Sequence, residues 1–456
     1  MDKRFPIQDQ IAMLASALKG RVVVATDVEY DAVRSVPLVN FDDKRPAAVI
    51  RVANAADVAA VVNFAQATGL ELAVRSGGHS LGGHSGNNGG LVIDLRDLNA
   101  LDIDEAGMTA WAGAGLTAGE VTHALEARGL IIGFGDAATV GIGGLTLGGG
   151  IGYLVRKYGL TIDNLLAAEI VTASGDILIA DEAQNADLFW ALRGGGGNFG
   201  VVTRFKFRLH ALPAFTGGPL ILPATPEVIA GFAAAAEYAP DELTAIAMAM
   251  PCPPLPFLPP ALYGQTVFMA MMAYAGPADE AAAVLAPFRA LATPIADLVG
   301  PAPLSSLYIP AERHATAIRT LFMDSIGIEE AETLLDHLGR SDVPMRMAQI
   351  RVLGGAFARV PADATAFAHR QSRVMVSYLA LCETTEAAER QVGWAANAVA
   401  ALKQGDNGAY VNFVGLEGKE RIRAAYPEGT WERLRQVKRR YDPENIFRLN
   451  QNIPPA

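Results

Sequence analysis

The chain has 456 residues, of which 51% are hydrophobic and 19% are charged, and its formal net charge is -11. This length suggests two domains, and this composition is that of a folded globular protein. The acidic excess argues against a nucleic-acid partner and against an anionic membrane surface. The two cysteines, Cys252 and Cys382, favour a reducing compartment without a disulfide framework. No signal peptide or membrane span is visible, so we expect a cytoplasmic protein.

The first 215 residues predict alternating strands and helices, which indicates an α+β domain built on βα units. A helix that begins after Thr117 carries Glu120 three residues on, the capping-box pattern, and Gly129 is its natural stop. The predicted strands cover 47–52, 72–74 and 91–95, and the predicted helices cover 54–67 and 116–128.

The residues from Arg75 to Ser80 read Arg-Ser-Gly-Gly-His-Ser between two predicted strands. Gly77 and Gly78 allow positive φ angles and a close approach of the backbone to a flat or phosphorylated ligand. His79 lies on this loop, free to reach such a ligand. Taken alone, the hexapeptide fits a surface turn with an incidental histidine equally well.

The segment 139–152 contains seven glycines in fourteen residues, which argues against a helix core or an ordinary strand. Consecutive glycine N–H groups form a concavity that binds anions. The G-x-G-x-x-G spacing is absent because Thr146 occupies its last position, and no Walker A lysine follows, which disfavours an NAD dehydrogenase or a kinase. Apolar residues alternate with the glycines, which disfavours a flexible linker.

A third glycine run, 194–197, lies between a short apolar helix that begins near Asp187 and a β-branched strand over 201–207. The region 216–407 then predicts further strands and helices, with Asp279 and Thr385 as N-caps. The predicted strands are 266–274, 346–353 and 373–381, and the predicted helices are 279–292 and 385–402. This region is rich in methionine, and methionines most simply fill a core; any that line a pocket would indicate an apolar substrate.

These segments together resemble the p-cresol methylhydroxylase / vanillyl-alcohol oxidase (PCMH-type) superfamily of FAD-linked oxidoreductases, and most closely its berberine bridge enzyme-like branch. The resemblance covers nearly the whole chain, because the tail segments also match. The matching residues are 75–80, 139–144, 148–152, 158–160, 163–164, 192–200, 410–413, 441–445 and 447–453.

The resemblance implies an α+β protein in three parts. These are a PCMH-type FAD-binding domain of two α/β subdomains over 1–215, a substrate-binding domain over 216–407 whose antiparallel sheet is covered by helices, and a C-terminal segment over 408–456 that returns to the FAD-binding domain. It also implies FAD joined to His79 through one covalent bond. The implied cofactor-binding residues are Arg75, Ser76, Gly77, Gly78, His79, Ser80, Thr139, Val140, Gly143, Gly144, Gly148, Gly149, Ile151, Gly152, Gly200, Val202, Asn450 and Gln451.

Two positions refine this expectation. Many relatives carry a cysteine where this chain has Ala137, so a second, cysteinyl flavin bond is not expected, and an oligosaccharide substrate is disfavoured. In relatives the position of Val140 lies beside the flavin carbon that oxygen attacks, and valine there accompanies oxidases. The resemblance therefore implies O2 as the acceptor and hydrogen peroxide as the product.

The candidate catalytic residues are Tyr410, Tyr378 and Asn412. Tyr410 and Asn412 are two residues apart, so on a strand they would point the same way. Tyr378 is a second candidate because its strand should face the flavin. Asp136 and His314 are also possible, although the sequence does not rank them. The run 438–440 reads as a solvated helix end.

The sequence thus predicts an oxidase that transfers hydride from an alcohol or amine carbon of a small molecule to FAD. A dehydrogenase with another acceptor, a sugar or oligosaccharide oxidase, and a non-catalytic flavin-binding protein are the alternatives. No metal site is predicted, and the substrate and the oligomeric state stay open.

Overall fold

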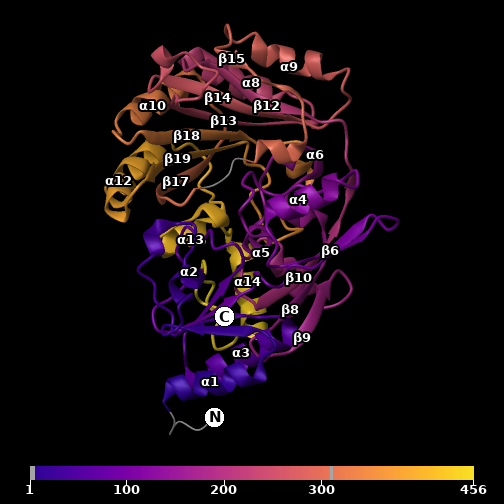
Figure 1. The fold of residues 1–456 in the computed structure, drawn as a ribbon. Helices are drawn as coiled ribbons and strands as arrows, with labels where there is room; N and C mark the ends of the chain where they lie inside the picture. Colours follow the sequence, from indigo (N-terminus) through magenta and orange to yellow (C-terminus); the bar gives the residue numbers. More distant parts are fainter. Residues whose placement is uncertain (1–5, 309–311) are drawn as a thin grey trace.

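The computed structural model describes residues 6–308 and 312–456. Three of the four β-sheets in these residues form its framework and are flanked by helices, and the fourth is a two-stranded pair (Figure 1). The largest sheet lies across one end of the molecule, and the two smaller sheets lie toward the other end together with helix α1 (Ile7–Ala17) and the C-terminus. No helix of the described ranges is long and apolar enough to cross a membrane.

The first sheet has four strands in the order β1-β2-β4-β3, and β4 pairs in parallel with both of its neighbours. The crossover helix α3 (Ala55–Thr68) begins where the Asn54 side chain accepts a hydrogen bond from the Asp57 N–H, and it ends at Gly69 with φ 74°. The strands are β1 (Arg21–Val24), β2 (Ala48–Arg51), β3 (Leu72–Arg75) and β4 (Leu91–Asp94), and α2 (Tyr30–Arg34) and η1 (Val39–Phe41) connect the first two.

The second sheet is antiparallel, in the order β5-β6-β10-β8-β9. Helix α4 (Ala118–Glu126) has the predicted capping box between Thr117 and Glu120. The strands are β5 (Leu101–Asp104), β6 (Thr109–Gly113), β8 (Leu165–Val171), β9 (Ile177–Asp181) and β10 (Val201–Arg208), with the small pair β7 (Leu130–Ile131) and β11 (His210–Ala211). Short helices on the connections are α6 (Val155–Tyr158), η2 (Thr161–Asn164) and α7 (Ala186–Leu192).

The glycine-rich segment contains a helix, α5 (Ile142–Gly148), so the expectation that it could not form one is wrong. Packing outweighs the low helix propensity of glycine here. A Cβ atom added at Gly143 would touch Ser76, and one added at Gly148 would overlap the Asn412 amide. The glycines therefore let this short helix lie directly against two other segments.

The third sheet is antiparallel and has eight strands in the order β15-β12-β14-β13-β18-β19-β17, with β16 paired to β12. Helices α8, α9 and α10 lie above it and α12 lies at one end (Figure 1). Its strands are β12 (Thr216–Pro223), β13 (Leu243–Pro251), β14 (Thr266–Tyr274), β15 (Ala296–Asp297), β16 (Gly300–Pro301), β17 (Ala315–Met323), β18 (Met345–Val352) and β19 (Val374–Cys382). Its helices are α8 (Pro226–Glu237), α9 (Ala281–Arg289), α10 (Ile328–Gly339), α11 (Ala356–Arg359) and α12 (Thr385–Ala401), with the 3-10 turns η3 (Pro260–Leu262) and η4 (Leu304–Leu307).

The predicted strands and helices of this region are present, and β14 has the predicted bounds. The predicted N-caps are wrong by one residue. The N-cap of α9 is Glu280 rather than Asp279, and the N-cap of α12 is Thr384, whose side chain accepts from the Ala387 N–H.

The tail returns to the two smaller sheets through η5 (Val411–Phe413), α13 (Lys419–Ala424) and α14 (Glu428–Tyr441). Lys438 is fully buried, so the expectation of a solvated helix end is wrong at this residue, whereas Arg439 and Arg440 are exposed. The Lys438 ammonium donates to Asp442 (2.6 Å), to the Asn198 carbonyl (2.7 Å) and to the Phe447 carbonyl (2.9 Å). These three acceptors use all of its donors, which explains how a lysine is accommodated in the core.

Candidate active site

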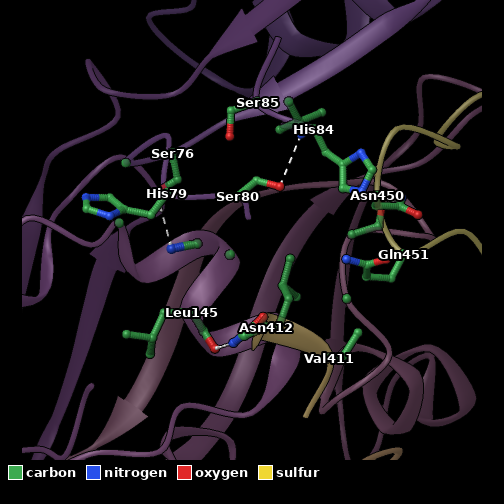
Figure 2. Close-up of a pocket in the computed structure, with 18 of the residues that line it drawn as sticks. Ser76, His79, Ser80, His84, Ser85, Leu145, Val411, Asn412, Asn450 and Gln451 are labelled. Atoms are coloured by element: carbon green, nitrogen blue, oxygen red, sulfur yellow. Dashed lines mark hydrogen bonds between the residues drawn. The ribbon is translucent and has the colours of Figure 1, made fainter. Parts of the chain in front are cut away.

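A pocket of about 410 Å³ lies where the three sheets and the C-terminal segment meet, a volume typical of ligand sites. Its wall comes mainly from five stretches far apart in the sequence, 76–85, 135–151, 196–202, 410–414 and 447–451, and is completed by Leu72, Val74, Leu95 and Ile318. Figure 2 shows His79 on one side of it, Asn450 and Gln451 on the opposite side, and Asn412 close to Leu145. Segments that the sequence marked separately are therefore brought together.

The loop after β3 forms one wall, and Arg75 supports it from behind. Arg75 is 2% exposed, pairs with the Asp94 carboxylate at 2.7 Å, and donates to the carbonyls of Val33 and Arg34. It does not line the pocket. A Cβ atom added at Gly77 would overlap the backbone of Gly141, so the two glycine segments touch directly.

His79 lines the pocket, and its Nε2 atom is buried without a hydrogen-bond partner among the described residues. Burial lowers the pKa of His79, and the nearby His314 lowers it further, although a hydrogen bond to the Thr139 backbone opposes them. The imidazole is therefore neutral at pH 7.

A second histidine, His84, lines the same pocket and was missed by sequence reasoning. Burial and the charge of Lys44 lower its pKa to about 4. The signal was present in the sequence, because Gly82-Gly83-His84-Ser85 repeats the Gly-Gly-His-Ser of the first motif. The Ser80 hydroxyl accepts from the His84 N–H at 3.1 Å and so joins the two repeats.

Parts of the pocket wall are bare backbone. A Cβ atom added at Gly144 or Gly197 would meet no other atom within 4 Å, and both residues line the pocket. Asn450 also lines it and, like His79, has a buried polar atom without a partner, its Oδ1. Backbone walls, unmatched polar atoms and apolar side chains such as Val202 fit a group with a diphosphate and flat rings, as FAD has.

Tyr410 and Asn412 lie together, although Tyr410 is the N-cap of the turn η5 and Asn412 lies within it, so neither is on the predicted strand. The Tyr410 oxygen accepts hydrogen bonds from the Asn412 amide (3.0 Å) and from the Gly150 N–H (3.0 Å). Burial raises the pKa of Tyr410, against the opposing effect of these hydrogen bonds. The phenol is therefore protonated at neutral pH, and its O–H has no acceptor among the described residues.

Tyr378 does not face the pocket, so the expectation for its strand is wrong. Its hydroxyl donates to the Leu334 carbonyl of α10 at 3.0 Å, and its ring contacts Trp394 of α12. Burial raises its pKa. The alternation along β19 was predicted correctly, but this face of the strand is the one that the helices cover.

Asp136 is the one carboxylate among the described residues that line the pocket. Its Oδ2 atom lies 2.7 Å from Nη2 of Arg351 on β18. His314 does not line the pocket, although its charge acts on His79.

Of the expected cofactor and catalytic residues, most lie in the pocket wall and six do not. Gly148, Gly149 and Gly152 pack against other parts of the protein, against Asn412, Phe367 and Phe134 respectively. The pocket-lining residues are Ser76, Gly77, Gly78, His79, Ser80, Val140, Gly143, Gly144, Ile151, Gly200, Val202, Tyr410, Asn412, Asn450 and Gln451. The six others are Arg75, Thr139, Gly148, Gly149, Gly152 and Tyr378.

Two family models match this chain. An FAD binding domain matches residues 46–181, and a domain described as berberine and berberine like matches residues 409–454. These segments contain the first and the last parts of the pocket wall.

Several known proteins are similar to this chain. An FAD-linked oxidoreductase of Bacillus subtilis is 30% identical over 463 residues, which cover 97% of this chain and 98% of that protein. (R)-6-hydroxynicotine oxidase of Paenarthrobacter nicotinovorans is 41% identical over 200 residues, 43% of each chain.

Solved structures agree in fold. The structure of 6-hydroxy-D-nicotine oxidase from Arthrobacter nicotinovorans has a TM-score of 0.84 and 27% identity over 96% of this chain and 98% of that one. A berberine bridge enzyme-like protein of Physcomitrella patens has a TM-score of 0.88 over 98% of this chain and 99% of that one, at 24% identity. The chain therefore belongs to the berberine bridge enzyme-like FAD-linked oxidoreductases and has their PCMH-type fold.

Proposed function

We propose that this enzyme is an oxidase whose FAD is joined to His79 by one covalent bond, and that it oxidises a small alcohol or amine. Bound FAD supplies the chemistry of a two-electron acceptor, with O2 as the final acceptor and hydrogen peroxide as the product. Residues 1–215 and 408–456 would hold the cofactor, and residues 216–407 would cover the substrate. Both cysteines are buried and unpaired, which supports a cytoplasmic location.

The observation that carries this proposal is the state of His79. Its ring is neutral, lies in the pocket wall, and has one buried nitrogen without a hydrogen-bond partner. A neutral imidazole is the nucleophilic form, which a covalent link requires. An unmatched buried nitrogen costs stability in the protein alone, and a bound cofactor would reduce that cost.

Tyr410 would bind the substrate as a hydrogen-bond donor. Asn412 and Gly150 donate to both acceptor positions of its oxygen, so the O–H group can still donate one hydrogen bond. The raised pKa keeps this proton in place at neutral pH, so we assign Tyr410 to donation rather than to proton abstraction. Asn412 would fix the direction of the phenol.

The single flavin bond can be tested by peptide mapping. We expect one flavin-bearing peptide, the one that contains His79, and no cysteinyl flavin. Ala137 lines the pocket at the position where a second link would form, and both cysteines lie in the large sheet region away from the pocket. A second modified peptide would contradict the assignment.

The role of O2 can be tested with Val140→Leu. Val140 lines the pocket, and one added methylene would fill space that a small diatomic needs, because interiors are close-packed. We expect reoxidation of the reduced enzyme by O2 to slow at least about tenfold, which corresponds to about 1.4 kcal/mol, with reduction by substrate little changed. Stopped-flow mixing with O2 measures both rates. Equal reoxidation rates in the two proteins, or a wild type that needs a dye acceptor, would favour a dehydrogenase.

The substrate class can be tested by anaerobic bleaching of the flavin with a panel of alcohols, amines and sugars. Similarity to a protein named 6-hydroxynicotine oxidase supports including cyclic amines. The methionine-rich face of the large sheet supports apolar members of the panel. Bleaching by sugars alone would favour a sugar oxidase. No bleaching by any reductant except dithionite would favour a non-catalytic flavin protein.

A further inference from the structure

We propose that Asp136 accepts the proton of the substrate and that Arg351 and Gln349 hold it in position. This assignment rests on the proposed function, because it names the proton acceptor of the same reaction. It concerns a residue that the flavin and Tyr410 assignments leave unused.

Asp136 lies in the pocket wall. Asp136 lies between Gly135 and Ala137, and all three residues line the pocket. Its side chain is 24% exposed. The Oδ2 atom is held by Arg351, whereas the Oδ1 atom receives no hydrogen bond from the part of the chain that the structure describes. An ionised carboxylate offers only acceptors, so Oδ1 is an open acceptor in the pocket.

Arg351 and Gln349 of β18 support Asp136. Arg351 is 4% exposed, and its Nε and Nη2 atoms donate to Oε1 of Gln349, at 3.2 Å and 2.6 Å. Its guanidinium lies 5.2 Å from the ring centroid of pocket residue Phe413. A buried arginine fixed by a neighbour on its own strand gives the carboxylate one direction, as a positioned acceptor needs.

The surroundings of this pair are mostly apolar. Opposite Arg351, the neighbouring strands place Ile246 on one side and Met375 on the other. The charge of Asp136 acts on two tyrosines, Tyr153 and Tyr308, and burial raises the pKa of both. Their hydroxyls bond the Leu307 carbonyl and Thr122. Arg351 is therefore the cation that pairs with Asp136 in these surroundings.

The proposed step needs three groups, which are the substrate, Asp136 and the flavin. The substrate O–H or N–H bond breaks, and its proton goes to Oδ1 of Asp136. The adjacent C–H bond breaks, its electron pair leaves as hydride to the flavin, and a C=O or C=N bond forms. Tyr410 offers a hydrogen-bond donor and Asp136 offers a hydrogen-bond acceptor. The pair therefore matches a substrate group that can both accept and donate a hydrogen bond, such as a hydroxyl or a neutral amine.

A binding experiment tests the assignment without turnover. Benzamidine is a cation that presents two N–H donors to a carboxylate, and benzamide is a neutral compound of similar shape. By calorimetry on the flavin-loaded enzyme, we expect Asp136→Asn to weaken benzamidine about tenfold or more and to leave benzamide nearly unchanged. Arg351→Gln should strengthen benzamidine, because it removes the competing cation, and Arg351→Lys should not.

The matched control is Asp297→Asn. Asp297 also pairs with an arginine, Arg289, at 2.7 Å and has a side chain that is 28% exposed, but it does not line the pocket. This variant should bind both probes as the wild type does.

A second experiment measures the rate of flavin bleaching with any compound of the panel that reduces the wild-type enzyme. Asp136→Asn should keep its flavin and slow bleaching at least about 100-fold.

Unchanged benzamidine affinity in Asp136→Asn, or no benzamidine binding by the wild type, would overturn the assignment even if no compound of the panel bleaches the flavin. Bleaching by Asp136→Asn at the wild-type rate would do the same and leave the oxidase proposal intact. A wild type that lacks flavin would contradict the oxidase proposal instead.

Discussion

Replacing Tyr410 with phenylalanine is expected to slow reduction of the flavin by substrate about 10²–10³-fold, the range for removing one positioned hydrogen-bond donor. The Tyr410 hydroxyl accepts from Asn412 and Gly150 and has one proton left to give. Because burial raises its pKa, no loss of rate from this group is expected as the pH rises toward 10. Anaerobic stopped-flow reduction over a pH series measures both effects.

The matched control is Tyr378→Phe, which removes the hydroxyl of the other tyrosine that the sequence suggested. This hydroxyl bonds the Leu334 carbonyl behind the sheet. We expect a loss of about 1 kcal/mol of unfolding free energy and a reduction rate close to that of the wild type. A Tyr410→Phe variant as fast as Tyr378→Phe would show that Tyr410 does not act on the substrate.

Replacing Lys438 with methionine is expected to destabilise the fold by about 3–5 kcal/mol. The variant leaves the fully buried Asp442 carboxylate without its cation and frees the carbonyls of Asn198 and Phe447. Both Asn198 and Phe447 line the pocket, so flavin loading should fall as well. Denaturant unfolding and the flavin-to-protein absorbance ratio measure the two effects.

Arg439→Met is the control on the same helix. Arg439 is exposed, so the change should stay within about 0.5 kcal/mol. Equal stability of the two variants would mean that the buried ion pair does not hold the C-terminal segment in place.

The sequence predicted those parts of the site that depend on local chemistry. Glycine loops beside strands, with one histidine in the loop, can be recognised from the sequence without knowledge of the fold. The bounds of β14 follow from its apolar run. His84 was equally visible as a repeat of the first motif, but a second copy of a motif does not say whether it reaches the same pocket.

The rest depended on contacts between distant segments. Alternation along β19 separates two faces but cannot say which one the helices cover, so Tyr378 was assigned to the wrong side. A lysine in a basic run gives no sign that three acceptors surround it, as they do Lys438. The helix α5 forms despite the low helix propensity of its glycines, because Ser76 and Asn412 pack on it.

Retention of the yellow colour after acid precipitation tests the central claim, that the flavin of this oxidoreductase is bound covalently to His79. We expect the colour to stay with the precipitated wild-type protein and His79→Ala to release it. His84→Ala should keep the colour, although His84 lies in the same pocket and in a second Gly-Gly-His-Ser sequence. Free FAD in the supernatant of the wild type, or colour retained by His79→Ala, would contradict this claim.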